Sequence, residues 1–334
     1  MFAYHHYPRL PMFPHIWCAG CGDGIVLKAL LRAIHKVGLA KDQVCMVSGI
    51  GCSSRLTGYV DFNTLHTTHG RPLAFATGIK MARPDMHVFV ITGDGDAMAI
   101  GGNHFIHACR RNIGITTILF NNRIYGMTGG QLAPTTPVGG VASTARYGSI
   151  DPPFDPCRVA IACGASYVAR GSSYHAQQLE RLIEGGIRNK GFSLVEVVTN
   201  CNTYYGRPNR MSLTDLLRWE KDNSVNVKAA AQMTPEQLRD KFTVGVLHQE
   251  TRPEYSAVYA DLVARVQGPA AARPAAGAKT EAAVEPGPGP AAAARSEAGE
   301  PSGDEGVPAP EEGLVGATAA EEQRGAAQEK GAGA

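Results

Sequence analysis

The stretch HVFVITGDGDAMAIGGNHFIHACRRN, residues 87–112, decides the fold class of this chain. It begins with a short apolar run that is typical of a buried strand, passes through a glycine-rich turn and ends in a helical pattern. The same succession recurs along the chain. Short apolar runs also occupy residues 43–47, 115–120 and 192–198, and helical patterns occupy 25–37, 73–82, 97–111 and 174–188. This alternation predicts an α/β fold with a mainly parallel sheet flanked by helices.

The unusual residues of the chain gather where the predicted strands end. These turns occupy residues 48–55, 93–96, 121–130 and 199–206. In open parallel sheets, ligands bind at the carboxyl ends of the strands, so we expect the functional site there. Residues 126–157 are rich in Gly, Pro, Thr and Ser and predict a long ordered loop, a feature that usually carries function.

The composition of the chain changes near residue 267. Residues 268–334 contain 21 Ala, 12 Gly and 8 Pro, have no aromatic residue and carry a net charge of −6, whereas residues 1–267 carry +8. A segment with so few large apolar side chains cannot offset the entropy lost on ordering, so we expect 268–334 to be a disordered tail. The predicted folded domain is therefore residues 1–267.

The overall composition excludes several classes of protein. The 334 residues include 32 Lys and Arg and 30 Asp and Glu, a balance that gives no argument for nucleic-acid binding. No apolar run approaches the roughly 20 residues that a membrane span needs. The opening MFAYHHYPRL lacks the layout of a secretory signal, so we expect a cytoplasmic protein. Eight Cys in such a protein indicate metal binding, redox chemistry or core packing before disulfides.

One group of residues predicts a site for a diphosphate and a metal ion. Gly93, Asp94, Gly95 and Asp96 follow a strand and open a helix, where glycine backbone and the helix N-terminus favour a phosphate. A carboxylate fits there when a cation bridges it to the anion, as Mg²⁺ does. Asn122 ends the next strand, 28 positions after Asp94, and a βαβ crossover returns the chain to the same edge of the sheet. Its side chain and the carbonyl of Ile124 could complete the ligand set.

A second group consists of four cysteines. Cys18 and Cys21 form a CxxC turn, and Cys52 and Cys201 lie in strand-end loops on the predicted ligand-binding edge. Four thiolates hold either Zn²⁺ or a [4Fe–4S] cluster, and their spacing alone does not distinguish the two. The other cysteines fit packing positions on predicted strands and helices, where buried Cys acts as a small hydrophobe; these are Cys45, Cys109, Cys157 and Cys163.

The chain resembles the beta subunits of 2-oxoacid:ferredoxin oxidoreductases, most closely the 2-oxoglutarate synthase type. The matching stretches are WCAGCGDGIVLKAL (17–30), SGIGCSSR (48–55), THGRPLAFATGIKMARPD (68–85), VITGDGDAMAIGGNHFIHACRRN (90–112), ILFNNRIYGMTGGQLAPTTP (118–137) and NCNTYYGR (200–207). Together they cover most of residues 15–207. The resemblance weakens after about residue 220 and does not reach the tail.

The resemblance implies thiamine diphosphate, Mg²⁺ and one [4Fe–4S] cluster as cofactors. The cluster ligands would be Cys18, Cys21, Cys52 and Cys201, and the Mg²⁺ ligands Asp94, Asn122 and the backbone oxygen of Ile124. Residues implied to line the thiamine cofactor are Ile50, Gly51, Cys52, Ser53, His69, Gly70, Gly93, Asp94, Gly95, Asp96, Asn122, Ile124, Tyr125, Gly126, Met127 and Thr128. Segments 1–22 and 200–230 would carry cluster ligands and meet a partner.

The implied reaction is the CoA-dependent oxidative decarboxylation of 2-oxoglutarate to succinyl-CoA and CO₂, with electrons passed to ferredoxin, or its reversal as a reductive carboxylation. The Glu that activates thiamine comes from the alpha subunit in this family, so this chain would need that partner. Pyruvate or a branched-chain 2-oxoacid is the alternative substrate. The other hypotheses are a thiamine enzyme without redox chemistry and a non-catalytic binding module stabilised by a Zn(Cys)₄ site.

Overall fold

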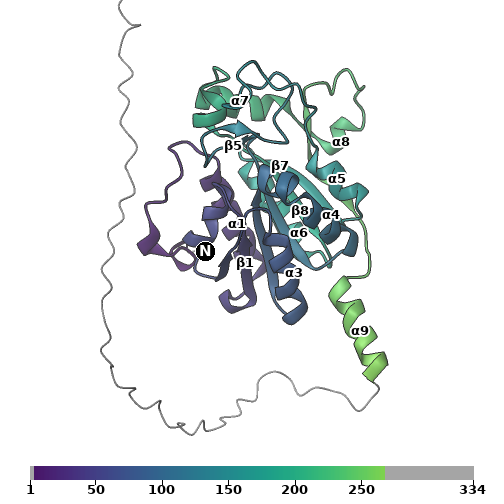
Figure 1. The fold of residues 1–334 in the computed structure, drawn as a ribbon. Coiled ribbons are helices and arrows are strands. Elements are labelled where there is room, and N and C mark those ends of the chain that lie inside the picture. Colours follow the sequence, from purple (N-terminus) through teal and green to yellow (C-terminus); the bar gives the residue numbers. More distant parts are fainter. Residues whose placement is uncertain (1–3, 268–334) are drawn as a thin grey trace, which may run out of the picture. The chain divides into compact units, whose positions relative to one another are not determined.

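The computed structural model of the chain describes residues 4–267 (Figure 1). The predicted disorder of 268–334 therefore lies outside the described residues. The described part forms an eight-stranded sheet with the order β2-β1-β3-β4-β8-β7-β10-β9. Its strands are β1 (Val44–Ser48), β2 (Asn63–His66), β3 (His87–Gly93), β4 (Ile115–Asn121), β7 (Tyr167–Ser172), β8 (Ser193–Val198), β9 (Ser224–Asn226) and β10 (Phe242–Gln249). All pairs in this sheet are parallel except β7 with β10.

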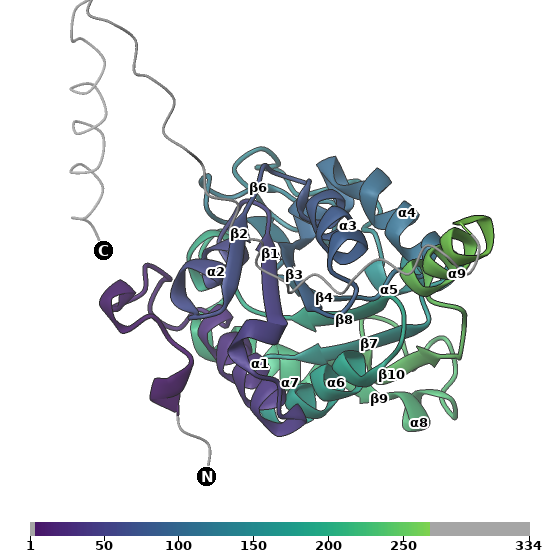
Figure 2. The same cartoon turned by 90° about the horizontal axis from the view of Figure 1, so that it is seen from below.

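Helices cover both faces of the sheet, as Figure 2 shows. They are α1 (Asp23–Val37), α2 (Leu56–Tyr59), α3 (Pro72–Ala82), α4 (Gly102–Arg111), α5 (Pro156–Ala162), α6 (Ala176–Arg188), α7 (Leu213–Asn223), α8 (Val227–Ala230) and α9 (Tyr255–Gln267). Alternate side chains of each strand enter different cores. Phe89 and Ile91 of β3 pack in the core with α1 and α6, whereas Val88 and Val90 pack in the core with α3, α4 and α5. Burial on both faces explains why these strands are continuous apolar runs.

The predicted α/β fold is confirmed, and the structure corrects several details. One predicted helix, 97–111, is interrupted: a π-helical turn over Asp96–Ile100 precedes α4. Four strands of the sheet, β2, β7, β9 and β10, were not predicted. Edge strand β2 is largely exposed and has no apolar pattern. Strand β10 is only partly buried and carries a bulge between Val246 and His248, which breaks its alternation.

The register of the central strands positions the site. In the parallel pair β3 and β4, Gly93 lies opposite Phe120, so the turns that follow both strands emerge side by side at the carboxyl edge. β8 lies on the other side of β4, with Val198 opposite Asn121, and brings residues 199–206 to the same edge. The loop after β4 folds back as a short hairpin of β5 (Ile124–Tyr125) and β6 (Gln131–Leu132). Within residues 4–267, no helix is long and apolar enough to cross a membrane.

Candidate cofactor and metal site

Asp94 is held at the centre of the carboxyl edge by three hydrogen bonds. Its Oδ1 accepts the Gly95 N–H at 2.9 Å, and its Oδ2 accepts the Arg123 N–H at 2.9 Å and the Thr135 hydroxyl at 2.5 Å. Burial raises the pKa of Asp94 to about 6, although these neutral donors lower it in part. A buried carboxylate with only neutral donors still lacks a counter-charge, and a divalent cation would supply one.

Asn122 lies next to Asp94, as the strand-end argument predicts. The Arg123 N–H that bonds Asp94 ties the two turns together. The Asn122 Oδ1 accepts the Ile124 N–H at 3.2 Å, and its side chain lines the cavity beside Asp94. The three predicted Mg²⁺ ligands, from Asp94, Asn122 and Ile124, are therefore contributed by two adjoining turns whose oxygens suit a hard cation.

Asp96, the second carboxylate of the turn, was also predicted to line the cofactor. It lines the same cavity, but its carboxylate is fully engaged: Oδ1 accepts from His69 Nδ1 at 2.6 Å, the Gly70 N–H at 2.7 Å and the Ile50 N–H at 3.3 Å. Its Oδ2 accepts the Thr92 hydroxyl at 2.7 Å. Asp96 therefore fixes the loops at 49–50 and 69–70 to the end of β3 while it contributes to the wall of the cavity.

The residues predicted to line the cofactor enclose one cavity. All of them contribute to its wall except Gly70, whose N–H is bonded to Asp96, and the wall also includes Phe120, which was not predicted. Small residues keep the cavity open. A Cβ on Gly95 would lie 2.2 Å from Cε1 of Tyr125, and the Tyr125 hydroxyl donates to the Gly95 carbonyl at 3.1 Å. The cavity therefore depends on glycine backbone beside an aromatic ring, which suits a ligand that contacts main chain.

The four predicted cluster cysteines line a second cavity of about 200 Å³. Gly126 lies between two of them, since a Cβ at this position would be 3.3 Å from Cys52 Sγ and 3.7 Å from Cys201 Sγ. The Cys21 N–H bonds the Cys18 carbonyl at 3.0 Å, so the CxxC segment is a tight turn that directs both thiols to the cavity. The four thiols are all unpaired by disulfides. Their number and convergence fit a metal centre with four thiolate ligands.

Burial raises the pKa of three thiols of this cavity, those of Cys21, Cys52 and Cys201, so these three favour the protonated form when no metal is bound. Burial, followed by the charge of Asp23, raises the pKa of Cys52 to about 12 and that of Cys21 further. Burial also raises the pKa of Cys201. A metal centre offsets such shifts because its charge stabilises the thiolates.

Sequence reasoning missed several residues around the two cavities. Asp23 is completely buried at the start of α1, where its carboxylate lies beside the Cys21 thiol. Thr135 reaches Asp94 from 41 positions away in the sequence. Trp17 packs against Tyr59 and donates its indole N–H to the Cys52 carbonyl at 2.7 Å, so it also fixes the cysteine cavity. Only the position of Trp17 beside Cys18 indicated such a role.

The remaining cysteines lie away from this site. Cys45 and Cys109 are buried in the core with α3 and α4, and Cys163 packs against the same core. Cys157 has a polar partner that packing alone does not predict, because its thiol donates to Glu196 at 3.0 Å. Glu196 also accepts from Arg170 at 2.6 Å, which completes a buried ion pair.

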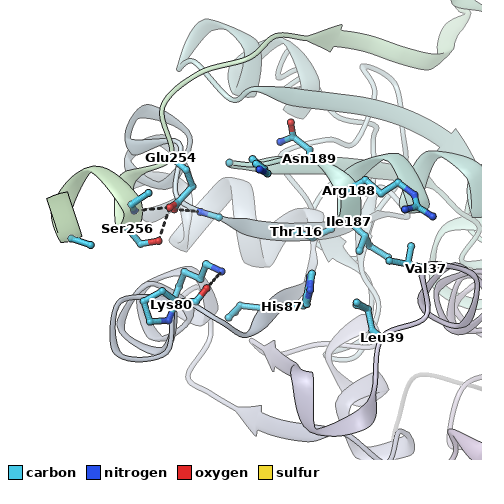
Figure 3. Close-up of a pocket in the computed structure, with 17 residues that line it drawn as sticks. Val37, Leu39, Lys80, His87, Thr116, Ile187, Arg188, Asn189, Glu254 and Ser256 are labelled. Carbon is cyan, nitrogen blue, oxygen red and sulfur yellow. Dashed lines mark hydrogen bonds between the residues drawn. The ribbon is translucent and has the colours of Figure 1, made fainter. Parts of the chain in front are cut away.

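A wider cavity of about 730 Å³ lies at the opposite, amino edge of the strands (Figure 3). Two of its charged side chains, Lys80 and Glu254, are bonded to the protein itself. Lys80 Nζ donates to the carbonyls of Pro84 at 2.7 Å and Met86 at 2.9 Å. Glu254 accepts the Gly114 N–H at 2.7 Å and the Ser256 hydroxyl at 2.5 Å. Lys80 and Glu254 therefore already have partners within the described residues, whereas the hydrogen bonds that Asp94 accepts there, at the carboxyl edge, come from neutral groups.

Comparisons with known proteins identify the class of this domain. Residues 49–197 match the family model of the thiamine pyrophosphate enzyme C-terminal TPP-binding domain. This stretch begins at the loop before Cys52 and includes the turns of Asp94 and Asn122. The fold and the matched segment thus define a thiamine diphosphate-binding enzyme domain.

Individual relatives specify the family. The chain is 54% identical over 250 residues to the 2-oxoglutarate synthase subunit KorB of Methanocaldococcus jannaschii, covering 75% of this chain and 93% of that protein. It is 56% identical over 220 residues to the same subunit of Archaeoglobus fulgidus, covering 66% and 80%. A solved 2-oxoglutarate:ferredoxin oxidoreductase from Magnetococcus marinus, with 2-oxoglutarate, coenzyme A and succinyl-CoA bound, is 32% identical, with a TM-score of 0.72, covering 80% and 91%. The chain belongs to the beta subunits of the 2-oxoglutarate:ferredoxin oxidoreductase family.

Proposed function

We propose that this chain holds thiamine diphosphate, Mg²⁺ and a [4Fe–4S] cluster in the beta subunit of a CoA-dependent 2-oxoglutarate:ferredoxin oxidoreductase. The observation that carries the proposal is the shared wall of two cavities. Cys52, Asn122, Gly126 and Met127 line both the cavity of Asp94 and the cavity of the four cysteines. A thiamine site and an electron acceptor separated by one layer of residues suit oxidative decarboxylation, with the reverse carboxylation running on the same site.

Within this proposal, Asp94, Asn122 and the Ile124 carbonyl hold Mg²⁺, and the turn at Gly93–Gly95 receives the diphosphate. The hydrogen bonds to Asp94 fix its carboxylate before the cation arrives, which lowers the entropy lost on binding. Met127 is exposed and lines both cavities. Thiamine diphosphate supplies the carbanion-stabilising chemistry, and the cluster accepts electrons.

The same geometry indicates that the catalytic site needs a partner chain. Two carboxylates belong to the described wall of the cofactor cavity, those of Asp94 and Asp96. Asp94 is assigned to Mg²⁺, and Asp96 accepts hydrogen bonds from His69 and Thr92, so neither is placed to activate the cofactor. We therefore expect the alpha subunit to supply the activating Glu and to complete the sites for the 2-oxoacid and CoA, with ferredoxin as the external acceptor. The eight unpaired cysteines suit a cytoplasmic location, where thiols stay reduced.

A substrate panel tests the proposal. The complex is purified anaerobically through a tag on this chain, and CoA-dependent viologen reduction is followed with 2-oxoglutarate, pyruvate and branched-chain 2-oxoacids. The proposal predicts a clear preference for 2-oxoglutarate. A preference for another 2-oxoacid would overturn the substrate assignment alone. No reduction with any of them, in a complex that retains thiamine and iron, would overturn the redox function.

Zinc analysis on the same preparation tests the binding-module hypothesis. A Zn(Cys)₄ scaffold would be colourless, contain one zinc per chain and have no affinity for thiamine diphosphate. The proposed subunit would be brown, with broad absorption near about 400 nm that reductant bleaches. One zinc per chain with no iron would contradict the cluster assignment.

A further inference from the structure

Helix α7 contacts the turns of both cavities, although none of its residues lines either of them. Its first residue, Leu213, packs against Gly20, within the CxxC turn. One turn later, Leu216 is buried in a small core with Ile124 and Tyr205. Trp219 lies under the guanidinium of Arg123, whose carbon is 3.8 Å from the centre of the indole ring.

Arg123 lies in the turn of residues 121–125, called the metal turn because it carries the predicted Mg²⁺ ligands Asn122 and Ile124. Its contact with Trp219 therefore bears on the proposed metal site. Arg123 has a φ of +64°, in the left-handed region that favours glycine. It nevertheless joins the turn to its surroundings, since its N–H bonds Asp94 and its carbonyl accepts the Thr136 hydroxyl at 2.6 Å. A conformation that costs free energy needs support from the side chain, and stacking on Trp219 provides it through a cation–π interaction.

Gly20 lies in the CxxC segment of residues 18–21, called the cysteine turn, and its contact with Leu213 bears on that turn in a similar way. Gly20 has a φ of +81°, and a Cβ there would lie 2.5 Å from Cδ2 of Leu213. The Gly20 carbonyl also accepts from the Asn200 side chain at 2.8 Å, so the turn is bonded on one side and packed on the other. Removing the Leu213 side chain would leave this turn, between Cys18 and Cys21, without its apolar support.

The helix itself is capped at its start and anchored to another segment at its far end. At its start, Ser212 and Asp215 form a capping box, with the Ser212 N–H donating to Asp215 Oδ2 at 2.9 Å. At its far end, buried Glu220 accepts the Ser173 hydroxyl at 2.8 Å and the Tyr174 N–H at 2.9 Å, which fix it to the loop before α6. The far end of the helix is therefore held by Ser173 and Tyr174, which line neither cavity.

We propose that α7 is a positioning helix that acts on the two cavities through separate residues. Trp219 stabilises the metal turn by packing on Arg123, and Leu213 stabilises the cysteine turn by packing on Gly20. The proposal rests on the proposed function, because it assigns the two turns to thiamine diphosphate with Mg²⁺ and to the cluster. Loss of either side chain is expected to weaken its own site and leave the other unchanged.

The test compares Trp219→Leu, Trp219→Phe and Leu213→Ala in the purified complex, with Thr214→Ala, an exposed position on the same helix, as the matched control. Dissociation constants for thiamine diphosphate with Mg²⁺ are measured by calorimetry after cofactor removal, and iron per chain by colorimetric assay. Trp219→Leu is expected to weaken thiamine diphosphate binding about three- to tenfold with iron unchanged, and Trp219→Phe to restore it to within about twofold. Leu213→Ala is expected to lower iron content with thiamine affinity unchanged.

A double-mutant cycle with Arg123→Gly separates positioning from general stability. Glycine tolerates the left-handed turn but offers no guanidinium, so Trp219→Leu should have no further effect on thiamine affinity in this background. An equal effect in both backgrounds, or a loss of both cofactors in parallel with the melting temperature in each variant, would overturn the proposal. If the wild-type complex binds neither thiamine diphosphate nor iron, the proposed function itself fails.

Discussion

The two edges of the sheet hold a half-buried carboxylate, Glu254, and a fully buried one, Asp94, whose surroundings shift their pKa values in opposite directions. At the amino edge, burial would raise the pKa of Glu254, but hydrogen bonds from Ser256, Ala257 and Gly114 outweigh it and lower the pKa. At the carboxyl edge, burial outweighs the hydrogen bonds of Asp94 and raises its pKa to about 6. The charge of Glu254 at the amino edge is thus stabilised by groups of this chain, whereas the charge of Asp94 at the carboxyl edge is not, and a bound cation would stabilise it.

This difference separates a functional site from a cavity that results from packing. The amino-edge cavity is wider, about 730 Å³, yet its Lys80 and Glu254 are bonded to main chain and hydroxyl groups. The cysteine cavity at the carboxyl edge is about 200 Å³ and gathers four thiols. The chemistry of groups left without a partner therefore locates the site better than volume does.

Substituting one carboxylate at each edge should give the largest contrast. Asp94→Asn removes the proposed Mg²⁺ ligand charge, and we expect thiamine diphosphate binding to weaken by at least about 100-fold, because losses outside the ligand shell already cost 10- to 100-fold. Iron content should not change. Glu254→Ala should leave thiamine affinity unchanged and lower the melting temperature, because Glu254 caps the start of α9. Calorimetry and thermal unfolding measure both, and unchanged thiamine affinity in Asp94→Asn would refute the metal assignment.

A cysteine pair extends the contrast to the cluster. Cys201→Ser removes one proposed ligand, so most of the bound iron should be lost, whereas thiamine affinity should change by less than about threefold. Cys163→Ser is the matched control, since this half-buried thiol packs against the core away from both cavities. Iron and sulfide assays report the result. Full iron content in Cys201→Ser would show that this residue is not a ligand.

A glycine pair tests how tightly each edge is built. Gly95→Ala would place a Cβ 2.2 Å from the Tyr125 ring and should weaken thiamine binding about tenfold. Gly114→Ala at the amino edge would meet Lys80 Cε at 2.9 Å and the Glu254 carboxylate at 3.3 Å, the movable ends of side chains, and should change neither affinity nor activity. Similar losses in both variants would contradict the distinction between the edges.

The smallest expected effect is a pH dependence at Glu220, which anchors α7. Burial raises its pKa to about 7, although the hydrogen bond from Ser173 and other contacts lower it in part. A carboxyl whose pKa is raised in the folded state stabilises the fold below about pH 4.5. This stabilisation is lost as the pH rises through about 7. Glu220→Gln, which keeps an acceptor, should therefore gain a few degrees in melting temperature relative to wild type between pH 5.5 and 8.5. A constant difference across this range would contradict the shift.

The central part of the fold was predictable because burial on both faces leaves continuous apolar strands. β1, β3, β4 and β8 were predicted for that reason. β7 was missed although it is fully buried, because its sequence, YVARGS, includes Arg170, whose charge is satisfied by Glu196 of the neighbouring strand. A charge neutralised by a residue 26 positions away cannot be recognised from local pattern.

The site shows the same limit. Asp94 and Asn122 were placed correctly because a parallel crossover fixes their edge. Asp94 and Asp96 look equivalent in the sequence, but the loops at 49–50 and 69–70 donate hydrogen bonds to Asp96 and not to Asp94. Thr135 and Trp219 could not be assigned, because their contacts depend on how the segments after β4 and β8 fold back onto the turns.

The most direct test of the account is whether the substrate reduces the cluster through the bound cofactor. The anaerobic complex, with and without thiamine diphosphate and Mg²⁺, is mixed with 2-oxoglutarate, and absorption near about 400 nm is followed together with the electron paramagnetic resonance of the reduced cluster. Adjacent cavities predict bleaching and a reduced-cluster signal only when thiamine diphosphate and Mg²⁺ are present. A fully loaded complex whose cluster stays oxidised with every 2-oxoacid tested would contradict it.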